Sequence, residues 1–247
     1  MLETDAFSVI RGSYRALILF GSHARGDARS DSDVDLLQVA PKPAVSYKIG
    51  VWSVSVYTEA LLRLLAGNGN LFAHHLITEG PVIAGDPEIL ARLSKRFVPR
   101  HPHEIVQDVY QSLPLLDSGT LDLSNGGDRL LALARYLLRT YIYAKVREAI
   151  QPTYSLDLAA SRLGLNHVVS LLRGSPPDKA IEKIRDVLES VLSSKAVNHF
   201  GSTEAFIVNV ETTSKFAAEL GLRLLTKEDL PYETVSAVAH LFMEDLE

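Results

Sequence analysis

The stretch Leu17–Val39, LILFGSHARGDARSDSDVDLLQV, contains two features whose spacing decides the fold. A short apolar run ends at the pair Gly21-Ser22, and after ten intervening residues an Asp-x-Asp pattern follows, formed by Asp33 and Asp35. Apolar runs of this length predict buried strands, and a glycine after such a run permits a tight turn. We therefore expect a strand, a turn, and a second strand that carries the two carboxylates.

This pattern is suited to binding a phosphate and a metal together. Ser22 is expected to open a short helix or turn, where the first N–H groups lack intrahelical partners and are able to meet phosphate oxygens. On a strand, residues two apart share a face, so Asp33 and Asp35 are expected to point together. Two carboxylates on one face repel each other unless a cation neutralises them, and oxygen ligands beside a phosphate suit Mg²⁺. The pattern predicts a site for a nucleoside triphosphate and Mg²⁺, with room for two ions.

Two other phosphate or metal motifs are excluded by particular residues. A calcium loop that began at Asp31 would have Leu36 where the turn requires glycine, and Lys42 where the loop requires a bidentate glutamate. The sequence also contains no Gly-x-x-x-x-Gly-Lys-Ser/Thr phosphate loop.

With Ala24-Arg25-Gly26 between its halves and Ser32 just before the first aspartate, the pattern resembles the minimal nucleotidyltransferases of the DNA polymerase beta superfamily. A weaker resemblance to antibiotic and antitoxin-type nucleotidyltransferases extends to about residue 100. Such enzymes transfer a nucleoside monophosphate, often AMP, from a nucleoside triphosphate such as ATP to a hydroxyl or a protein side chain. The resemblance implies that Asp33 and Asp35 are the catalytic residues and metal ligands. It also implies a nucleotide-binding set, Gly21, Ser22, Arg25 and Ser32.

The chain departs from this family at one position. Members usually carry a third carboxylate on the next strand, which here reads Val51–Tyr57 and alternates serines with valines. Ser55, or as a second choice Ser53, occupies the expected place, and a serine supplies no negative charge. Four other acids are candidates to substitute, namely Glu59, Glu79, Glu104 and Asp108. Two hypotheses stay open: a transferase with a substitute acid, or a nucleotide-binding regulatory or antitoxin-like protein whose transfer activity is weakened or lost.

The composition of the chain limits which partners and which cellular compartment we expect for the protein. The 247 residues are 47% hydrophobic and lack any run long enough to span a membrane, and the first residues lack the pattern of a signal peptide, so we expect a cytoplasmic protein. The absence of cysteine excludes disulfides and thiolate zinc sites. A net charge of −5 without basic blocks argues against a wide nucleic-acid surface, so a small molecule or a protein is the expected acceptor. A homodimer or a toxin-like partner is compatible with these features.

The pattern along the chain predicts two domains and an α/β (α+β) fold. Residues 1–100 form a small mixed-sheet nucleotidyltransferase domain with strands near 16–20, 34–39, 50–57 and 81–84, and with helices near 58–66, 70–79 and after Asp86-Pro87. The stretch 99–103 is typical of a hinge. Residues 101–247 form an all-α helical bundle, with helices expected at 127–150, 155–163, 166–174, 175–195, 203–220 and 226–246.

Overall fold

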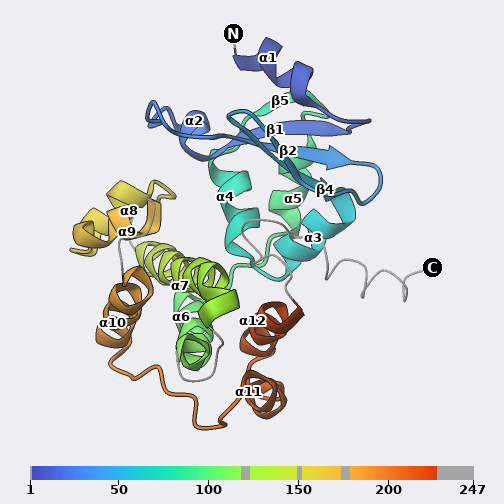
Figure 1. Ribbon diagram of the computed structural model, residues 1–247. Helices are drawn as coiled ribbons and strands as arrows, with labels where there is room; N and C mark the ends of the chain where they lie inside the picture. The colour runs from blue at the N-terminus through green and yellow to red at the C-terminus, as the bar shows by residue number, and fades with distance from the viewer. Residues whose placement is uncertain (1, 118–122, 149–151, 174–178, 227–247) are drawn as a thin grey trace. The chain divides into compact units, whose positions relative to one another are not determined.

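The computed structural model describes residues 2–117, 123–148, 152–173 and 179–226 (Figure 1). These residues divide into two compact units, one that ends at Arg100 and one that begins at His101. The first is a sheet with helices and the second is built from helices, so the predicted fold class is confirmed. Among the described helices, none is both long and apolar enough to cross a bilayer.

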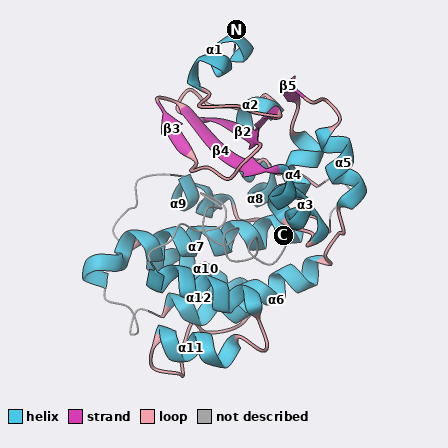
Figure 2. Cartoon of the chain, turned by 90° about the vertical axis from the view of Figure 1, so that its right-hand side faces the viewer, coloured by secondary structure: helices cyan, strands magenta, loops and turns pink. Residues whose placement is uncertain are grey.

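The first unit is organised around a five-stranded mixed sheet with the strand order β3-β4-β2-β1-β5 (Figure 2). β2 and β4 pair in parallel, and the other neighbouring pairs are antiparallel. The strands are β1 Ala16–Phe20, β2 Val34–Ala40, β3 Tyr47–Ile49, β4 Trp52–Thr58 and β5 Val82–Gly85.

Both faces of this sheet are covered, which is why its central strands are apolar on both sides. On one face Leu37 and Val39 pack against helices α3 Glu59–Gly67, α4 Leu71–Glu79 and α5 Ile89–Arg96. On the other face Leu36 lies in a smaller core that helix α1, Leu2–Val9, covers. Figure 1 shows α1 and the group of α3, α4 and α5 on opposite sides of the sheet. Because side chains alternate along a strand, Asp35 lies on the face of Leu37 and Val39.

The second unit is a helical bundle in which the long helix α7 contacts α6, α8 and α10. Its buried residues recur at helical spacing, as at Leu130, Ala134, Leu137 and Leu138. The helices are α6 Pro102–Ser112, η1 Leu113–Leu116, α7 Leu123–Val146, α8 Leu156–Arg162, η2 Asn166–Val168, α9 Val169–Arg173, α10 Ala180–Leu192, α11 Thr203–Val210 and α12 Lys215–Thr226.

The structure corrects several predicted elements. The strand expected at 50–57 is β4, and the sequence did not predict β3, which a turn with Gly50 at a positive φ of 57° separates from β4. The helix after Asp86-Pro87 begins at Ile89, with Glu88 as its N-cap, and Asp86 accepts a hydrogen bond from the backbone N–H of Glu88 in the preceding turn. The sequence did not predict α1 or α6. The helix expected at 203–220 is divided into α11 and α12, and the one expected at 226–246 lies outside the described residues apart from its first residue.

Candidate functional site

The two halves of the Gly-Ser and Asp-x-Asp pattern meet at one end of the antiparallel pair β1 and β2. Phe20, the last residue of β1, is the register partner of Asp35 in β2. The helix α2, Gly21–Arg25, begins directly after Phe20. The strand pairing therefore brings the Gly-Ser turn to the two aspartates, as the sequence pattern requires for a shared site.

Gly21 makes the close approach between the turn and the aspartates possible. Its φ is +72°, and a Cβ built on it would overlap the carboxylate oxygen Oδ2 of Asp35. Any residue with a side chain would therefore need both a strained backbone and a displaced Asp35. Ser22 follows with a partly exposed side chain. The glycine at this position is thus a requirement of the site as well as of the turn.

Asp35 is held in a setting that disfavours its charged form. Burial and the negative charge of neighbouring Asp33 raise the pKa of Asp35 to about 6. The positive charges of Arg25, His23 and Lys48 lower this pKa without cancelling the rise. A divalent cation would remove the repulsion between the two carboxylates, so the electrostatics fit a metal site.

Asp33 precedes the first residue of β2 and has a half-exposed side chain. Its Oδ2 accepts a hydrogen bond of 2.7 Å from the ammonium group of Lys48 on β3. Nothing in the sequence pattern pointed to Lys48, because the segment containing it was not predicted to be a strand. The ion pair joins Asp33 to the edge strand of the sheet.

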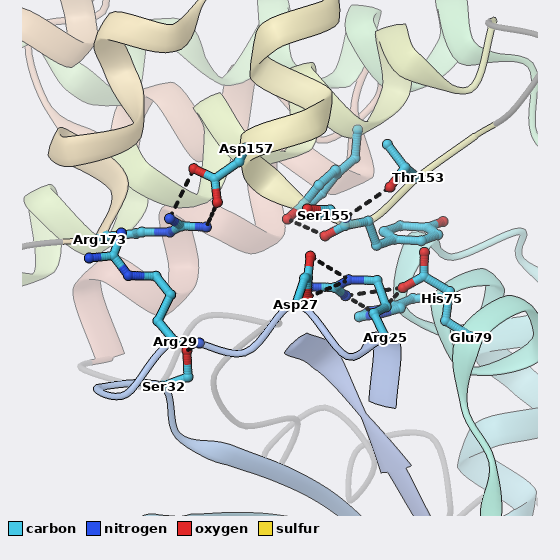
Figure 3. Close-up of polar contacts among 12 residues, drawn as sticks. Arg25, Asp27, Arg29, Ser32, His75, Glu79, Thr153, Ser155, Asp157 and Arg173 are labelled. Carbon is cyan, nitrogen blue, oxygen red and sulfur yellow. Dashed lines mark hydrogen bonds and ion pairs between the residues drawn. The ribbon is translucent and has the colours of Figure 1, made fainter. Parts of the chain in front are cut away.

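Arg25, which the resemblance assigns to the nucleotide, points into the protein (Figure 3). Its guanidinium group lies 3.0 Å from Glu79 Oε2 and 3.2 Å from Asp27 Oδ1, and its Nη1 lies 3.3 Å from Nε2 of the buried His75. These contacts fasten α2 to α4. Arg25 is still close enough to lower the pKa of Asp35, so its charge reaches the site even though its hydrogen bonds go to other residues.

Ser32 closes the loop before the aspartates. Its hydroxyl accepts a hydrogen bond of 2.9 Å from the backbone N–H of Arg29, a contact that Figure 3 draws. The backbone N–H of Ser32 in turn donates to the carbonyl of Arg29 at 3.1 Å. In this structure Ser32 therefore shapes the loop that leads into Asp33.

The register places Ser53, rather than Ser55, beside the aspartates. Ser53 is the register partner of Asp35, whereas Ser55 pairs with Leu37 one step further along β2. Both serines lie on the face of Asp35, because the valines and Trp52 of β4 pack into the opposite core. Ser53, the second choice from the sequence, therefore matches the position of the expected third acid better than Ser55 does.

The four substitute acids are engaged elsewhere or lie in the other unit. Glu59 follows the far end of β4 and pairs with three arginines, Arg15, Arg63 and Arg92. Glu79 pairs with Arg25 and with His75. Glu104 and Asp108 belong to α6 of the helical unit. Within the described parts of the chain, no three side chains of His, Asp or Glu come together as a metal-binding group.

A matched pair of variants tests the role of Gly21. Gly26 has a similar φ of +77° but open space around its missing Cβ, so Gly26→Ala should cost only the backbone strain, about 1 kcal/mol. Gly21→Ala should cost about 1–3 kcal/mol more, because its methyl group displaces Asp35. The fluorescence of Trp52, the single tryptophan, follows unfolding of the sheet. Equal losses in the two variants would contradict the packing of Gly21 against Asp35.

The raised pKa of Asp35 predicts how the stability of the fold depends on pH. A carboxyl group whose pKa is about 6 in the folded state and about 3.9 in the unfolded state destabilises the fold once it is charged. This destabilisation is complete above pH 6 and absent below pH 3.9. Asp35→Asn should therefore raise the free energy of unfolding by about 1–3 kcal/mol at pH 7.5 without Mg²⁺, and the gain should vanish near pH 4. A loss of stability at pH 7.5 would show that the charge of Asp35 is compensated in the fold.

The sequence was compared with protein families, with curated proteins and with solved structures. A family model described as a nucleotidyltransferase domain matches residues 11–68, a range that includes the Gly-Ser turn, both aspartates, β3 and β4. A crystal structure of a nucleotidyltransferase-like protein from Exiguobacterium sibiricum 255-15 matches with 17% sequence identity and a TM-score of 0.33, over 92% of this chain and 89% of that chain. Among curated proteins, none matches the sequence. The family match therefore covers the part of the chain that carries the Gly-Ser turn and both aspartates.

Proposed function

We propose that this protein is a Mg²⁺-dependent nucleotidyltransferase that moves a nucleoside monophosphate from a nucleoside triphosphate to a hydroxyl group of a small molecule or a protein. AMP is the nucleoside monophosphate that we propose it transfers. The observation that carries the proposal is the packing of the Gly21 turn against Asp35 of the Asp-x-Asp pair. This contact joins an element suited to phosphate with one suited to a metal, inside the range that matches the family.

The donor set at the site fits Mg²⁺. Asp33 and Asp35 offer carboxylate oxygens, the ligands that Mg²⁺ prefers, and a cation would relieve the repulsion that raises the pKa of Asp35. When bound, Mg²⁺ would supply positive charge to the phosphate oxygens and to the leaving group. Asp33 and Asp35 would hold it, and the missing side chain at Gly21 leaves the space in which the backbone turn lies against Asp35.

The proposed reaction is an in-line displacement at the α-phosphorus. The acceptor hydroxyl forms the new P–O bond and loses its proton to solvent water, and the bond from the α-phosphorus to the bridging oxygen breaks so that pyrophosphate leaves. The residues of this chain act mainly by position and charge: the Gly21-Ser22 turn binds the phosphates, and Arg25, the last residue of α2, adds positive charge.

A second function is favoured by one observation on β4. Where a third carboxylate is expected, Ser53 lies beside Asp35, and a serine supplies no charge and takes no proton at neutral pH. A protein with this site is able to bind a nucleotide and a metal without efficient transfer. The second candidate is therefore a nucleotide-binding regulatory or antitoxin-like protein.

Conservative substitutions separate the two candidates. Asp33→Asn and Asp35→Asn should each lower Mg²⁺-dependent transfer of labelled nucleoside monophosphate by at least about a hundredfold, because each removes a charged metal ligand. Asp31→Asn is the matched control, since Asp31 is an exposed aspartate of the same loop that pairs with Arg29. The assay offers labelled ATP, GTP, CTP and UTP to cell extract, small-molecule hydroxyl acceptors and co-purifying proteins.

Three outcomes decide between the candidates. Transfer that is lost in both site variants and kept in Asp31→Asn supports the transferase. Nucleotide binding in the wild-type protein without transfer to any acceptor supports the regulatory protein. Transfer that persists unchanged in both site variants contradicts both candidates, because each requires these aspartates to bind the metal and its nucleotide.

A further inference from the structure

Lys48 lies in the row of the sheet that holds Asp35. It is the register partner of Ser53 in the antiparallel pair β3 and β4, and Ser53 is the partner of Asp35 in the parallel pair β4 and β2. Directly paired residues on neighbouring strands project to the same face. The row therefore runs from the metal-binding aspartate through a serine to a lysine.

The ammonium group of Lys48 reaches across this row to the other aspartate. Its Nζ donates to Asp33 Oδ2 at 2.7 Å, and the side chains of Lys48 and Asp33 are 59% and 45% exposed. An ion pair this exposed contributes little to stability, so its partners exchange easily for others. The lysine stem is also long and flexible enough for the ammonium to move while the backbone of β3 stays in place.

The charges at the site favour a single divalent cation. Asp33 and Asp35 bring two negative charges and Lys48 brings one positive charge, while Ser53 adds no charge where a third carboxylate would have added another negative one. One Mg²⁺ leaves a small positive excess, which suits a polyanionic triphosphate. A second Mg²⁺ would be placed against the ammonium group without a third carboxylate to hold it.

We propose that Lys48 is a phosphate-binding residue of a one-metal site, which leaves Asp33 and binds a triphosphate oxygen when a metal-bound triphosphate occupies the two aspartates. This inference rests on the proposed function and names the residue that takes the place of the second cation. Before the ligand binds, the ammonium competes with the metal for Asp33. After it binds, the ammonium contributes to holding the phosphates.

The two effects of Lys48 have opposite signs, and this makes them testable by calorimetry. The probes are Mn²⁺ alone and inorganic tripolyphosphate with Mg²⁺, so the result does not depend on which base the protein prefers. In Lys48→Met, Mn²⁺ alone should bind several-fold more tightly because its competitor is gone, and tripolyphosphate should bind about tenfold more weakly because a charged hydrogen bond is lost.

Two further variants control for charge and for side-chain loss. Lys42→Met removes an exposed lysine of the same unit in the segment after β2, and it should match the wild-type protein with both probes. Lys48→Arg keeps the positive charge and should retain most of the tripolyphosphate affinity. With tripolyphosphate present, the wild-type protein should bind one Mn²⁺ per chain.

The outcomes distinguish a failure of this inference from a failure of the proposed function. Wild-type protein that binds neither Mn²⁺ nor tripolyphosphate overturns both. Wild-type protein that binds both, together with Lys48→Met that behaves like Lys42→Met, overturns only the role of Lys48. Binding of two Mn²⁺ ions per chain in the presence of tripolyphosphate likewise contradicts the one-metal site and leaves the proposed function standing.

Discussion

The contact between Gly21 and Asp35 is the constraint on which the site depends. It arises because β1 and β2 pair so that Phe20 lies opposite Asp35, which brings the residue after Phe20 against the carboxylate. A Cβ at residue 21 would fill the space that the carboxylate occupies. The strand register, the turn and the Asp-x-Asp pair are therefore aspects of one packing arrangement, and a change in any of them disturbs the others.

The charges around this contact disfavour the ionised form of Asp35. Burial and the nearby charge of Asp33 make it costly for Asp35 to ionise, and the positive groups near it relieve only part of that cost. Functional sites often store such unfavourable charge, which a ligand then relieves. Lys48 pairs with Asp33 and Glu79 pairs with Arg25, so these two charged groups of the site each have a protein partner.

The sequence predicted the local features of the first unit well. β1, β2, α3 and α4 lie within one or two residues of their expected positions, because apolar runs, turn residues and caps are local signals. The alternation of β4 also placed the serines and valines on opposite faces correctly. These features could be predicted without knowing which strands are neighbours in the sheet.

Features that depend on tertiary contacts could not be predicted. The register that makes Ser53 the neighbour of Asp35 is fixed by the pairing of β2 with β4, and residues far apart in the sequence determine it. The inward direction of Arg25 depends on Glu79, 54 positions away. Lys48 was missed because β3 is only three residues long and joins the site through its neighbours in the sheet.

The most direct test of the account is a crystal structure with Mn²⁺ and a non-hydrolysable nucleoside triphosphate analogue, in which anomalous scattering locates the metal. A one-metal site at the two aspartates predicts one strong peak within about 2.5 Å of carboxylate oxygens of both Asp33 and Asp35, with the triphosphate against the Gly21-Ser22 turn and Lys48 on a phosphate oxygen. A metal bound away from these aspartates, or no metal at saturating Mn²⁺ with Lys48 still paired to Asp33, would contradict it.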